Sequence, residues 1–254
     1  WDENGAEQLI VPVLGENIEI RGITLLDGGS WHIVPVACKN VLIEDVNVLG
    51  KVITGDGVDI VGCENVVLRN CFIRANDDCI SIKAVEFQDP SGCTDVRHIL
   101  VEDCLFWNAE FETRCDEITD VVFRNCDVVH CQYEGNQSGG VLTIHNADRA
   151  HVHDIVYENI RIEDAQEKFI DIKTLDSKYS RDRERGMVND IFFKNIEITE
   201  GTFPVSIIRG FEMKNEVCRP HGFYFDNVVI HGEKVMSPGE LHMVVELSDE
   251  LKFQ

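Results

Sequence analysis

The sequence predicts an all-β fold, a single-stranded right-handed parallel β-helix of about 8–10 coils, and three observations lead to it. A nine-residue phrase, NVVLRNCFI at residues 65–73, recurs in altered form along the whole chain. Within each copy, apolar and polar residues alternate as in a strand with one buried face. The sixth position is always Gly, Asp or Asn, and the alternation breaks there. Since one coil of a solenoid buries its apolar face only against its neighbours, such a repeat predicts stacked coils.

The copies of the phrase mark the strands that we expect, in chain order. They are NIEIRGITL (17–25), NVLIEDVNV (40–48), NVVLRNCFI (65–73), HILVEDCLF (98–106), DVVFRNCDV (120–128), DIVYENIRI (154–162), DIFFKNIEI (190–198) and GFYFDNVVI (222–230). Their starts are separated by 23, 25, 33, 22, 34, 36 and 32 residues. The shortest intervals predict a minimal coil of about 22 residues, and the longer ones predict insertions.

The columns of this alignment assign each part of the coil. Positions two and four are apolar in every copy, and so are positions seven and nine, which indicates a strand on each side of position six. Gly, Asn and Asp tolerate left-handed backbone, so position six predicts a sharp corner along which Asn side chains stack and bond. Helical patterns are scarce and no Pro/Gly/Ser-rich linker occurs, so residues 1–254 are expected to form one domain.

The longer intervals and the two ends complete the prediction. Residues 84–97, 131–140 and 176–189 carry turn formers or charges and are expected to be loops that line a binding groove. The tail, residues 239–254, predicts a final strand and a cap. The chain starts with Trp and shows no N-terminal cap, which suggests a fragment or a trimmed chain.

Composition excludes several classes of partner. Lys and Arg number 23 against 46 Asp and Glu, a net charge of −23 that disfavours nucleic acid and anionic lipid. No run of 18 apolar residues exists, so we expect no membrane span. Three of the ten cysteines, Cys71, Cys104 and Cys126, take a slot that holds Val or Ile in other copies. We therefore expect mostly free, buried thiols, with room for one disulfide, and no zinc-type ligand spacing is present.

Acidic residues precede two short strand-like runs. Aligning GDGVDI (55–60) with NDDCISI (76–82) by their last Ile pairs Asp56 with Asp78, while Asp77 stands at the same corner. On neighbouring coils these carboxylates would lie roughly 5 Å apart at the backbone, so at least one pKa should be raised. Spacing alone leaves three interpretations open: acid–base hydrolysis of a glycosidic bond, aspartates that cap corners, or a calcium site.

The stretch TGDGVDI (54–60) followed by NDDCISIK (76–83) resembles the NTDGxDI…GDDCIAIK signature of the polygalacturonases, glycoside hydrolase family 28. The ANDD spelling is similar to the related dextranase and isopullulanase family 49. The resemblance implies a right-handed parallel β-helix that cleaves a polysaccharide with inversion, without a cofactor or a metal, in a secreted or periplasmic protein. By this resemblance Asp77 is the general acid, and Asp56 and Asp78 orient and activate the attacking water.

Two motifs of that family are altered here. Where it carries Gly-His-Gly, this chain has LFWNAEFETR (105–114), with Glu110 near that place and no His. Where it carries Arg-Ile-Lys, Thr143 and His145 stand, and the similar IDIKT (170–174), with Lys173, comes one coil later. These departures favour a neutral or unusual glycan over galacturonate.

The remaining candidates are contacts to the carbohydrate. Lys83 ends the CISI run, where it either donates to a sugar hydroxyl or is solvated, and Trp107 either stacks on a sugar or packs. His130, His151 and His153 stand near corners or strand starts and are read as structural. The expected substrate-binding residues are Asp59, Lys83, Trp107, Glu110, His145 and Lys173.

The sequence therefore predicts an inverting glycoside hydrolase that acts on a poly- or oligosaccharide in a groove along the β-helix. Two alternatives share the architecture: a calcium-dependent polysaccharide lyase, and a non-catalytic β-helix that binds glycans or serves as a structural shaft.

Overall fold

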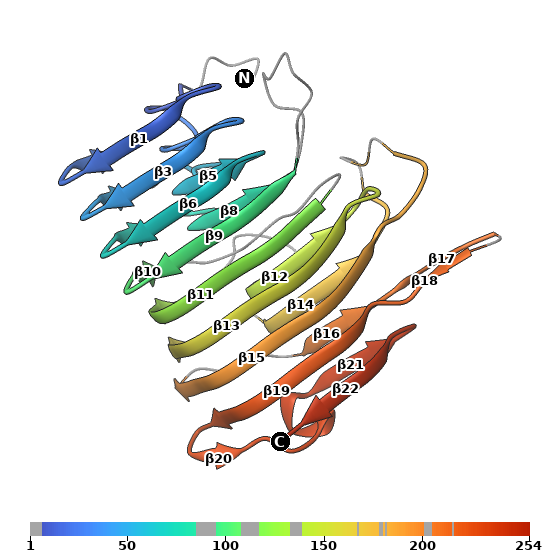
Figure 1. The fold of residues 1–254 in the computed structure, drawn as a ribbon. Helices are drawn as coiled ribbons and strands as arrows, with labels where there is room; N and C mark the ends of the chain where they lie inside the picture. Colours follow the sequence, from blue (N-terminus) through green and yellow to red (C-terminus); the bar gives the residue numbers. More distant parts are fainter. Residues whose placement is uncertain are drawn as a thin grey trace.

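The chain winds into a right-handed parallel β-helix whose coils stack from the N-terminus to the C-terminus (Figure 1). The structure is a computed structural model, and it describes residues 7–84, 95–107, 117–132, 139–166, 168–177, 180, 182–200, 205–214 and 216–254. Within these residues no helix is long and apolar enough to span a membrane.

One column of parallel strands follows the repeated phrase. Its members, in spatial order, are β1 (Glu16–Arg21), β3 (Lys39–Glu44), β6 (Glu64–Arg69), β9 (Val96–Glu102), β11 (Glu117–His130), β13 (His151–Asp164), β15 (Met187–Glu200), β19 (His221–Ile230) and β22 (Asp249–Phe253). The fourth positions of successive copies are in register; Ile43 pairs with Leu68, and Leu68 with Val101. The nine rungs of the described chain agree with the predicted number of coils.

The second column lies beyond the corner at position six. It comprises β2 (Thr24–Leu26), β4 (Asn47–Leu49), β7 (Phe72–Arg74) and β10 (Leu105–Trp107), followed by the second half of β11. The predicted corner is confirmed, since Asn125 and Asn159 have φ of 53° and 54°. Asn159 Nδ2 donates to Asn125 Oδ1 at 3.0 Å, so the Asn side chains do bond along the stack.

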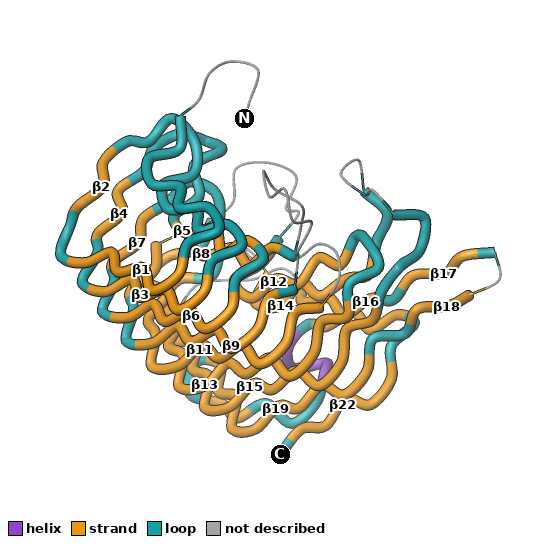
Figure 2. Tube along the Cα trace, turned by 45° about the horizontal axis from the view of Figure 1, so that its top comes forward, coloured by secondary structure: helices purple, strands orange, loops and turns teal. Residues whose placement is uncertain are grey.

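The third face carries the shorter strands (Figure 2). They are β5 (Val58–Val61), β8 (Ile80–Lys83), β12 (Gly140–Asn146), β14 (Lys168–Thr174), β16 (Ser206–Arg209) and β21 (Met243–Glu246). β5 pairs with β8, and β12, β14, β16 and β21 form a four-stranded parallel sheet. Single bridges join Ile10, Ile33 and Val58, which extends this face toward the N-terminus.

The remaining elements are small. A hairpin of β17 (Phe211–Met213) and β18 (Glu216–Cys218) projects from the stack, β20 (Glu233–Lys234) pairs with β19, and η1 (Pro238–Leu241) is one turn of 3-10 helix. The tail forms two strands, β21 and β22, rather than the one expected. Of the predicted loops, residues 85–94 and 133–138 lie outside the described residues, and the third ends where β15 begins at Met187.

Inward-facing columns fill the interior. Phe123, Tyr157, Phe193, Phe225 and Phe253 stack in that order, with adjacent ring centroids 4.4 to 5.4 Å apart. The cysteines of the described chain are buried thiols outside any disulfide, as predicted for most of them: Cys38, Cys63, Cys71, Cys79, Cys104, Cys126, Cys131 and Cys218.

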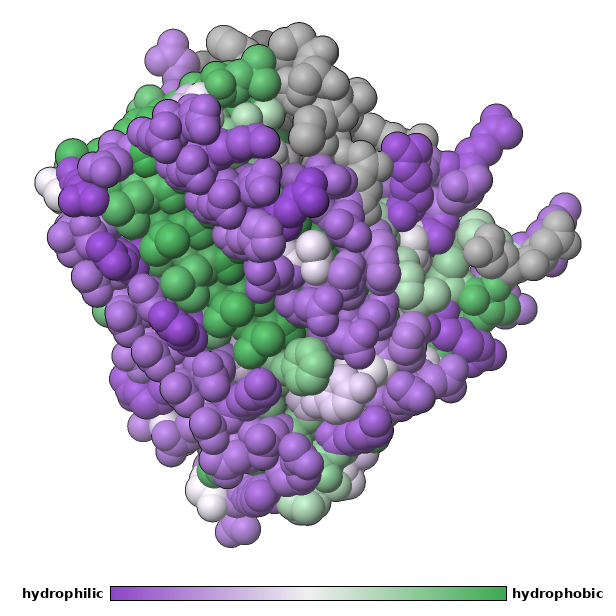
Figure 3. Space-filling view, viewed as in Figure 1, coloured by the Kyte–Doolittle hydropathy of each residue, from purple (hydrophilic) through white to green (hydrophobic). Residues whose placement is uncertain are grey.

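The outer surface of the main sheet carries an apolar stripe. Figure 3 shows a hydrophobic band across a largely hydrophilic face. The third position of the phrase points outward there, and its residues are in register from rung to rung, for example Leu100 with Val122 and Val122 with Val156. From Leu42 to Tyr224 the side chains along this row are apolar and half-buried, whereas the first copy has the exposed Glu19 there.

Candidate active site

The two aspartates that begin the acidic runs lie on adjacent coils, as the alignment predicts. Val58 pairs with Ile80 and Asp59 with Ser81, and the Gly57 N–H donates to the Asp78 carbonyl at 2.7 Å. A Cβ at residue 57 would collide with the Ile73 side chain and the Cys79 carbonyl, so only Gly permits this approach. The backbones of Asp56 and Asp78 are therefore held next to each other.

The acidic side chains differ in their access to solvent. Asp56 and Asp78 are 2% and 3% exposed and Asp59 is fully buried, whereas Asp77 is half-buried. Ile60 and Ile80 point into the core, so alternation directs the side chains of Asp59 and Lys83 out of the coil. Asp77 is thus the most exposed of the four carboxyl groups.

Lys83 is buried among carboxylates. Its Nζ lies 2.6 Å from Asp59 Oδ1, 3.1 Å from Asp56 Oδ2 and 3.7 Å from the centre of the Trp31 ring. Burial lowers the pKa of Lys83, but the charges of Asp59, Asp56 and Asp78 outweigh it and raise the pKa above its ordinary value. The interpretation of Lys83 as a solvated strand end is wrong, because only 4% of the residue is exposed.

Asp59 is the carboxyl group whose pKa is raised well above its ordinary value. Burial is the main cause, and the neighbouring Asp56 adds to it, while Lys83 opposes the shift. Asp59 was not among the three carboxyl groups for which the sequence predicts a raised pKa, and it lies beside them. Asp56 Oδ1 and Asp59 Oδ2 are both buried without a donor, and a proton on Asp59 shared with Asp56 would satisfy this pair.

Two residues of the preceding coil, missed from the sequence, support the cluster. Gly28 N–H donates to His32 Nε2 at 3.2 Å, which leaves Nδ1 to donate to the Asp56 carbonyl at 2.7 Å. Trp31 covers Lys83. The bridge between Ile33 and Val58 aligns HIVPV (32–36) with GVDIVG (57–62). This alignment of the sequence would have pointed to Trp31 and His32.

A second charged group lies on β12 and β14. Asp171, fully buried, contacts Lys173 at 2.7 Å, Lys168 at 3.1 Å and His145 at 3.5 Å. Burial raises the pKa of Asp171, but His145 and Lys173 outweigh it, and the pKa lies below its ordinary value. His145 is in register with Lys173, and Lys173 with Arg209 on β16. Asp171 and Lys168 were not singled out from the sequence.

Trp107 is a further candidate and belongs to neither of these two groups. Trp107 ends β10, is 40% exposed, and has the guanidinium of Arg74 5.9 Å from its ring centre and the His130 ring at 6.1 Å. It pairs with Arg74, three residues before Asp77. Glu110 lies outside the described residues.

Residues 4–243 match the family model "Glycosyl hydrolases family 28". Among curated proteins, an exopolygalacturonase of Zea mays is 28% identical over 211 residues, covering 73% of this chain and 45% of that protein. A probable polygalacturonase of Vitis vinifera is 33% identical over 78 residues, which are 30% of this chain and 16% of that protein. The chain spans less than half the length of these relatives.

Solved structures show the same fold. The exopolygalacturonase of Thermotoga maritima aligns with a TM-score of 0.60 at 19% identity, over 87% of this chain and 54% of that one. The polygalacturonase of Erwinia carotovora aligns with a TM-score of 0.57 at 16% identity, over 94% of this chain and 59% of that one.

Proposed function

The chain belongs to glycosyl hydrolases family 28, and from that membership we propose that it hydrolyses a glycosidic bond of a poly- or oligosaccharide with inversion. The observation that carries the proposal is the placement of Asp56 and Asp78 on adjacent rungs, with the half-buried Asp77 beside them. Inverting hydrolysis requires one carboxyl group to protonate the leaving oxygen and another to take a proton from water.

The exposure of each carboxyl group supports the division of roles. Asp77 reaches solvent and is the general acid that meets the glycosidic oxygen. Asp56 and Asp78 orient and activate the attacking water, and one of the two takes its proton. Asp59 and Lys83 are buried, which favours positioning roles: Lys83 fixes Asp56 Oδ2, and Asp59 holds Lys83 from the other side.

Two outer features supply contacts to the sugar chain. Trp107 presents an exposed ring near the coil that carries Asp77, and such rings stack on apolar sugar faces. On β14, Lys173 is half-buried, and its ammonium group contacts Asp171 at 2.7 Å, so a partly accessible cation lies on this face. A cation there fits an acidic sugar, whereas the altered motifs favour a neutral one. The relatives are named polygalacturonases, so polygalacturonate is the first substrate to test.

The test is a hydrolysis assay of the 254-residue chain on polygalacturonate and dextran, with reducing ends as the readout. Wild type is expected to release reducing ends from polygalacturonate, and proton NMR should show the inverted anomer first. Asp77→Asn removes the acid and should lower the rate by about 10²–10⁴-fold. Asp45→Asn is the matched control, because Asp45 is an exposed corner residue at which other coils carry Asn.

Each alternative has its own outcome. Equal rates for Asp77→Asn and wild type would refute the acid assignment. Products that absorb in the near ultraviolet and vanish with a calcium chelator would indicate a lyase. Cleavage of dextran but not of polygalacturonate would contradict an acidic substrate. If neither polysaccharide is cleaved, the hydrolase proposal fails in favour of a glycan-binding module.

A further inference from the structure

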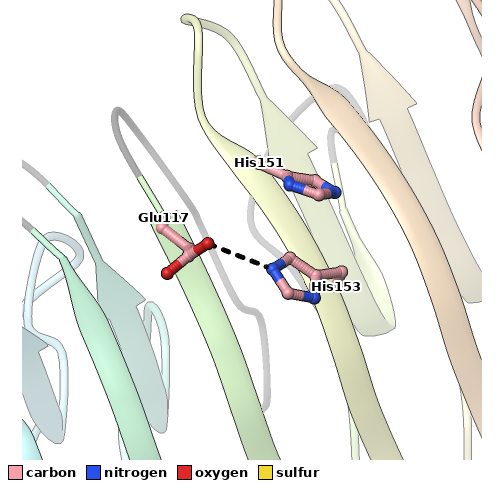
Figure 4. A group of neighbouring side chains, drawn as sticks. All are labelled: Glu117, His151 and His153. Atoms are coloured by element: carbon pink, nitrogen blue, oxygen red, sulfur yellow. Dashed lines mark hydrogen bonds and ion pairs between the residues drawn. The ribbon is translucent and has the colours of Figure 1, made fainter.

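Glu117, His151 and His153 form a group on the outer side of the main sheet (Figure 4). Their strands, β11 and β13, belong to a different sheet from β5 and β8, which carry the aspartate site. His151 and His153 are two residues apart at the start of β13 and therefore point to the same side. Glu117 begins β11 and is the register partner of His151. One ligand atom from each residue lies within 4.8 Å of the others, and in the described part of the chain this is the one such trio of His, Cys, Asp or Glu.

We propose that these three side chains bind a divalent transition-metal ion, with Zn²⁺ as the expected ion. Two imidazole nitrogens and one carboxylate oxygen are a donor set that Zn²⁺ accepts, with water completing the tetrahedron. Carboxylate-only sites suit Ca²⁺ and Mg²⁺, whereas imidazole selects the later first-row metals. The sequence, in which no zinc-type spacing occurs, predicts no metal here because the ligands come from two coils.

The tautomer of His151 is set by its outer partner. Asn189 Nδ2 donates to Asp190 Oδ2 at 2.7 Å, which turns Asn189 Oδ1 toward His151. His151 Nε2 lies 2.6 Å from that oxygen and must donate to it. The lone pair of His151 is therefore on Nδ1 and is available to a metal.

His153 is oriented in the same way. Its Nδ1 lies 2.7 Å from Asp154 Oδ2, and a carboxylate can only accept, so Nδ1 carries a proton. Nε2 lies 3.4 Å from Glu117 Oε1, where either a proton or a metal ion can bridge the two atoms. A histidine whose second nitrogen donates to a carboxylate or an amide oxygen is the usual arrangement around a bound metal, because it fixes the ring and raises its basicity.

Access and charge fit the same ligand. His151 is exposed, and the other two ligands are half-buried, so an ion can enter from solvent. The two imidazole rings lie 4.1 Å apart, and the carboxylates of Glu117 and Asp154 provide the negative charge that a cation requires. A bound ion would tie β11 to β13 where β11 begins.

The test is calorimetric titration of the chelator-treated chain with Zn²⁺, with Co²⁺ absorption as a second readout of the ligands. Wild type should bind one ion, and the Co²⁺ spectrum should show nitrogen and oxygen ligation without a thiolate charge-transfer band. His151→Ala, His153→Ala and Glu117→Gln should each abolish this binding. Asn189→Ala, which frees the His151 ring, should weaken it by about 10-fold or more.

His98→Ala is the matched control. His98 Nδ1 lies 2.6 Å from Asp120 Oδ2 in an exposed His–Asp pair like that of His153, but this pair is not part of a three-ligand group. Its loss should leave the affinity unchanged. The proposal is overturned if wild type binds no Zn²⁺ at micromolar concentration, if the His151 and His153 variants bind as wild type does, or if the Co²⁺ spectrum reports thiolate. Circular dichroism of each variant separates loss of a ligand from loss of the fold.

Discussion

Lys83 shows how a charge is kept inside this protein. Moving an ammonium group out of water costs several kcal/mol, and the two carboxylates at 2.6 and 3.1 Å offset that cost. Three ionised groups would leave one negative charge in excess. A proton on Asp59 removes this excess among the groups that Lys83 contacts, and the raised pKa of Asp59 agrees with it. The result is a fixed orientation of Asp56, with the charge of Asp78 close by.

This protonation state predicts a pH dependence of stability. The unfolded chain ionises Asp59 at about pH 3.9, whereas the folded chain keeps its proton to a higher pH. Above pH 3.9 the folded state therefore binds more protons, and stability falls as pH rises until the folded pKa is passed. In Asp59→Asn the amide imitates the neutral carboxyl group but does not ionise, so this loss of stability at higher pH should disappear.

The measurement is urea unfolding of both proteins at pH 4.5 and pH 7.5. The free energy of unfolding of wild type minus that of Asp59→Asn should fall by more than about 1 kcal/mol between these values. The subtraction cancels the contributions of other carboxyl groups to the pH dependence. Asp171 is one of them, and its lowered pKa makes stability fall as the pH becomes more acidic. A constant difference would mean that Asp59 is ionised in the folded protein.

Each copy of the repeated phrase holds two left-handed residues rather than one. Position six was predictable, because Gly, Asp and Asn alone occupy it. The first position of the phrase also has positive φ, for example Asn65 at 58° and His98 at 57°. Its residue types are more mixed, since His appears among them, and the signal was missed. The two corners are lined by separate ladders, such as Asn65 to Asn40 and Asn195 to Asn159.

The ladder at position six makes a prediction about the elements that it joins. Asn159 donates to Asn125 and accepts from Asn195, both at 3.0 Å, with φ of 54°. Asn159→Ala removes both hydrogen bonds and places an alanine, whose side chain cannot bond to the local backbone, in the left-handed conformation. The free energy of unfolding should fall by about 2–4 kcal/mol. Asn159→Gly keeps the backbone and loses only the bonds, at about 1–2 kcal/mol.

Denaturant unfolding of the two variants tests this order. The difference in free energy of unfolding between the two variants gives the cost of the left-handed backbone. The loss of stability in the Gly variant gives the contribution of the Asn side-chain hydrogen bonds. If Ala and Gly were equally destabilising, the left-handed conformation at residue 159 would carry no energetic cost, contrary to the proposed role of the corner.

The sequence predicts the parts of the site that follow from coil stacking. The register of Val58 on Ile80 came from the repeat alone, since a strand period of two fixes which residues meet. The repeat did not predict the burial of Lys83 or its contact with Trp31, because both depend on how the outward side chains are covered. The group around Asp171 was missed for another reason: Lys168 and His145 come from coils whose spacing is irregular.

At the scale of the whole molecule, the stack combines a neutral interior with a strongly acidic surface. The inward columns are apolar from the Ile and Val rungs at the N-terminal end to the aromatic stack that ends at Phe253. Most ionisable side chains of the described residues lie on the surface, and the buried exceptions outside the aspartate site include Asp148, Asp171 and Lys168. The whole chain carries 46 acidic residues against only 23 Lys and Arg. Exposed pairs such as that of Lys51 and Asp27 neutralise part of this charge locally and contribute about 0–1 kcal/mol each.

The net charge of −23 therefore predicts that salt stabilises the fold. Repulsion among surface carboxylates extends over the Debye length, which falls from about 30 Å at 0.01 M to about 8 Å at 0.15 M ionic strength. Screening weakens the exposed ion pairs too, but these contribute less than the summed repulsion. The melting temperature should rise by about 2–4 °C per kcal/mol of relieved repulsion. Scans in NaCl and KCl should agree, because the effect depends on ionic strength and not on the ion, and a melting temperature that falls with either salt would show that ion pairs dominate the surface.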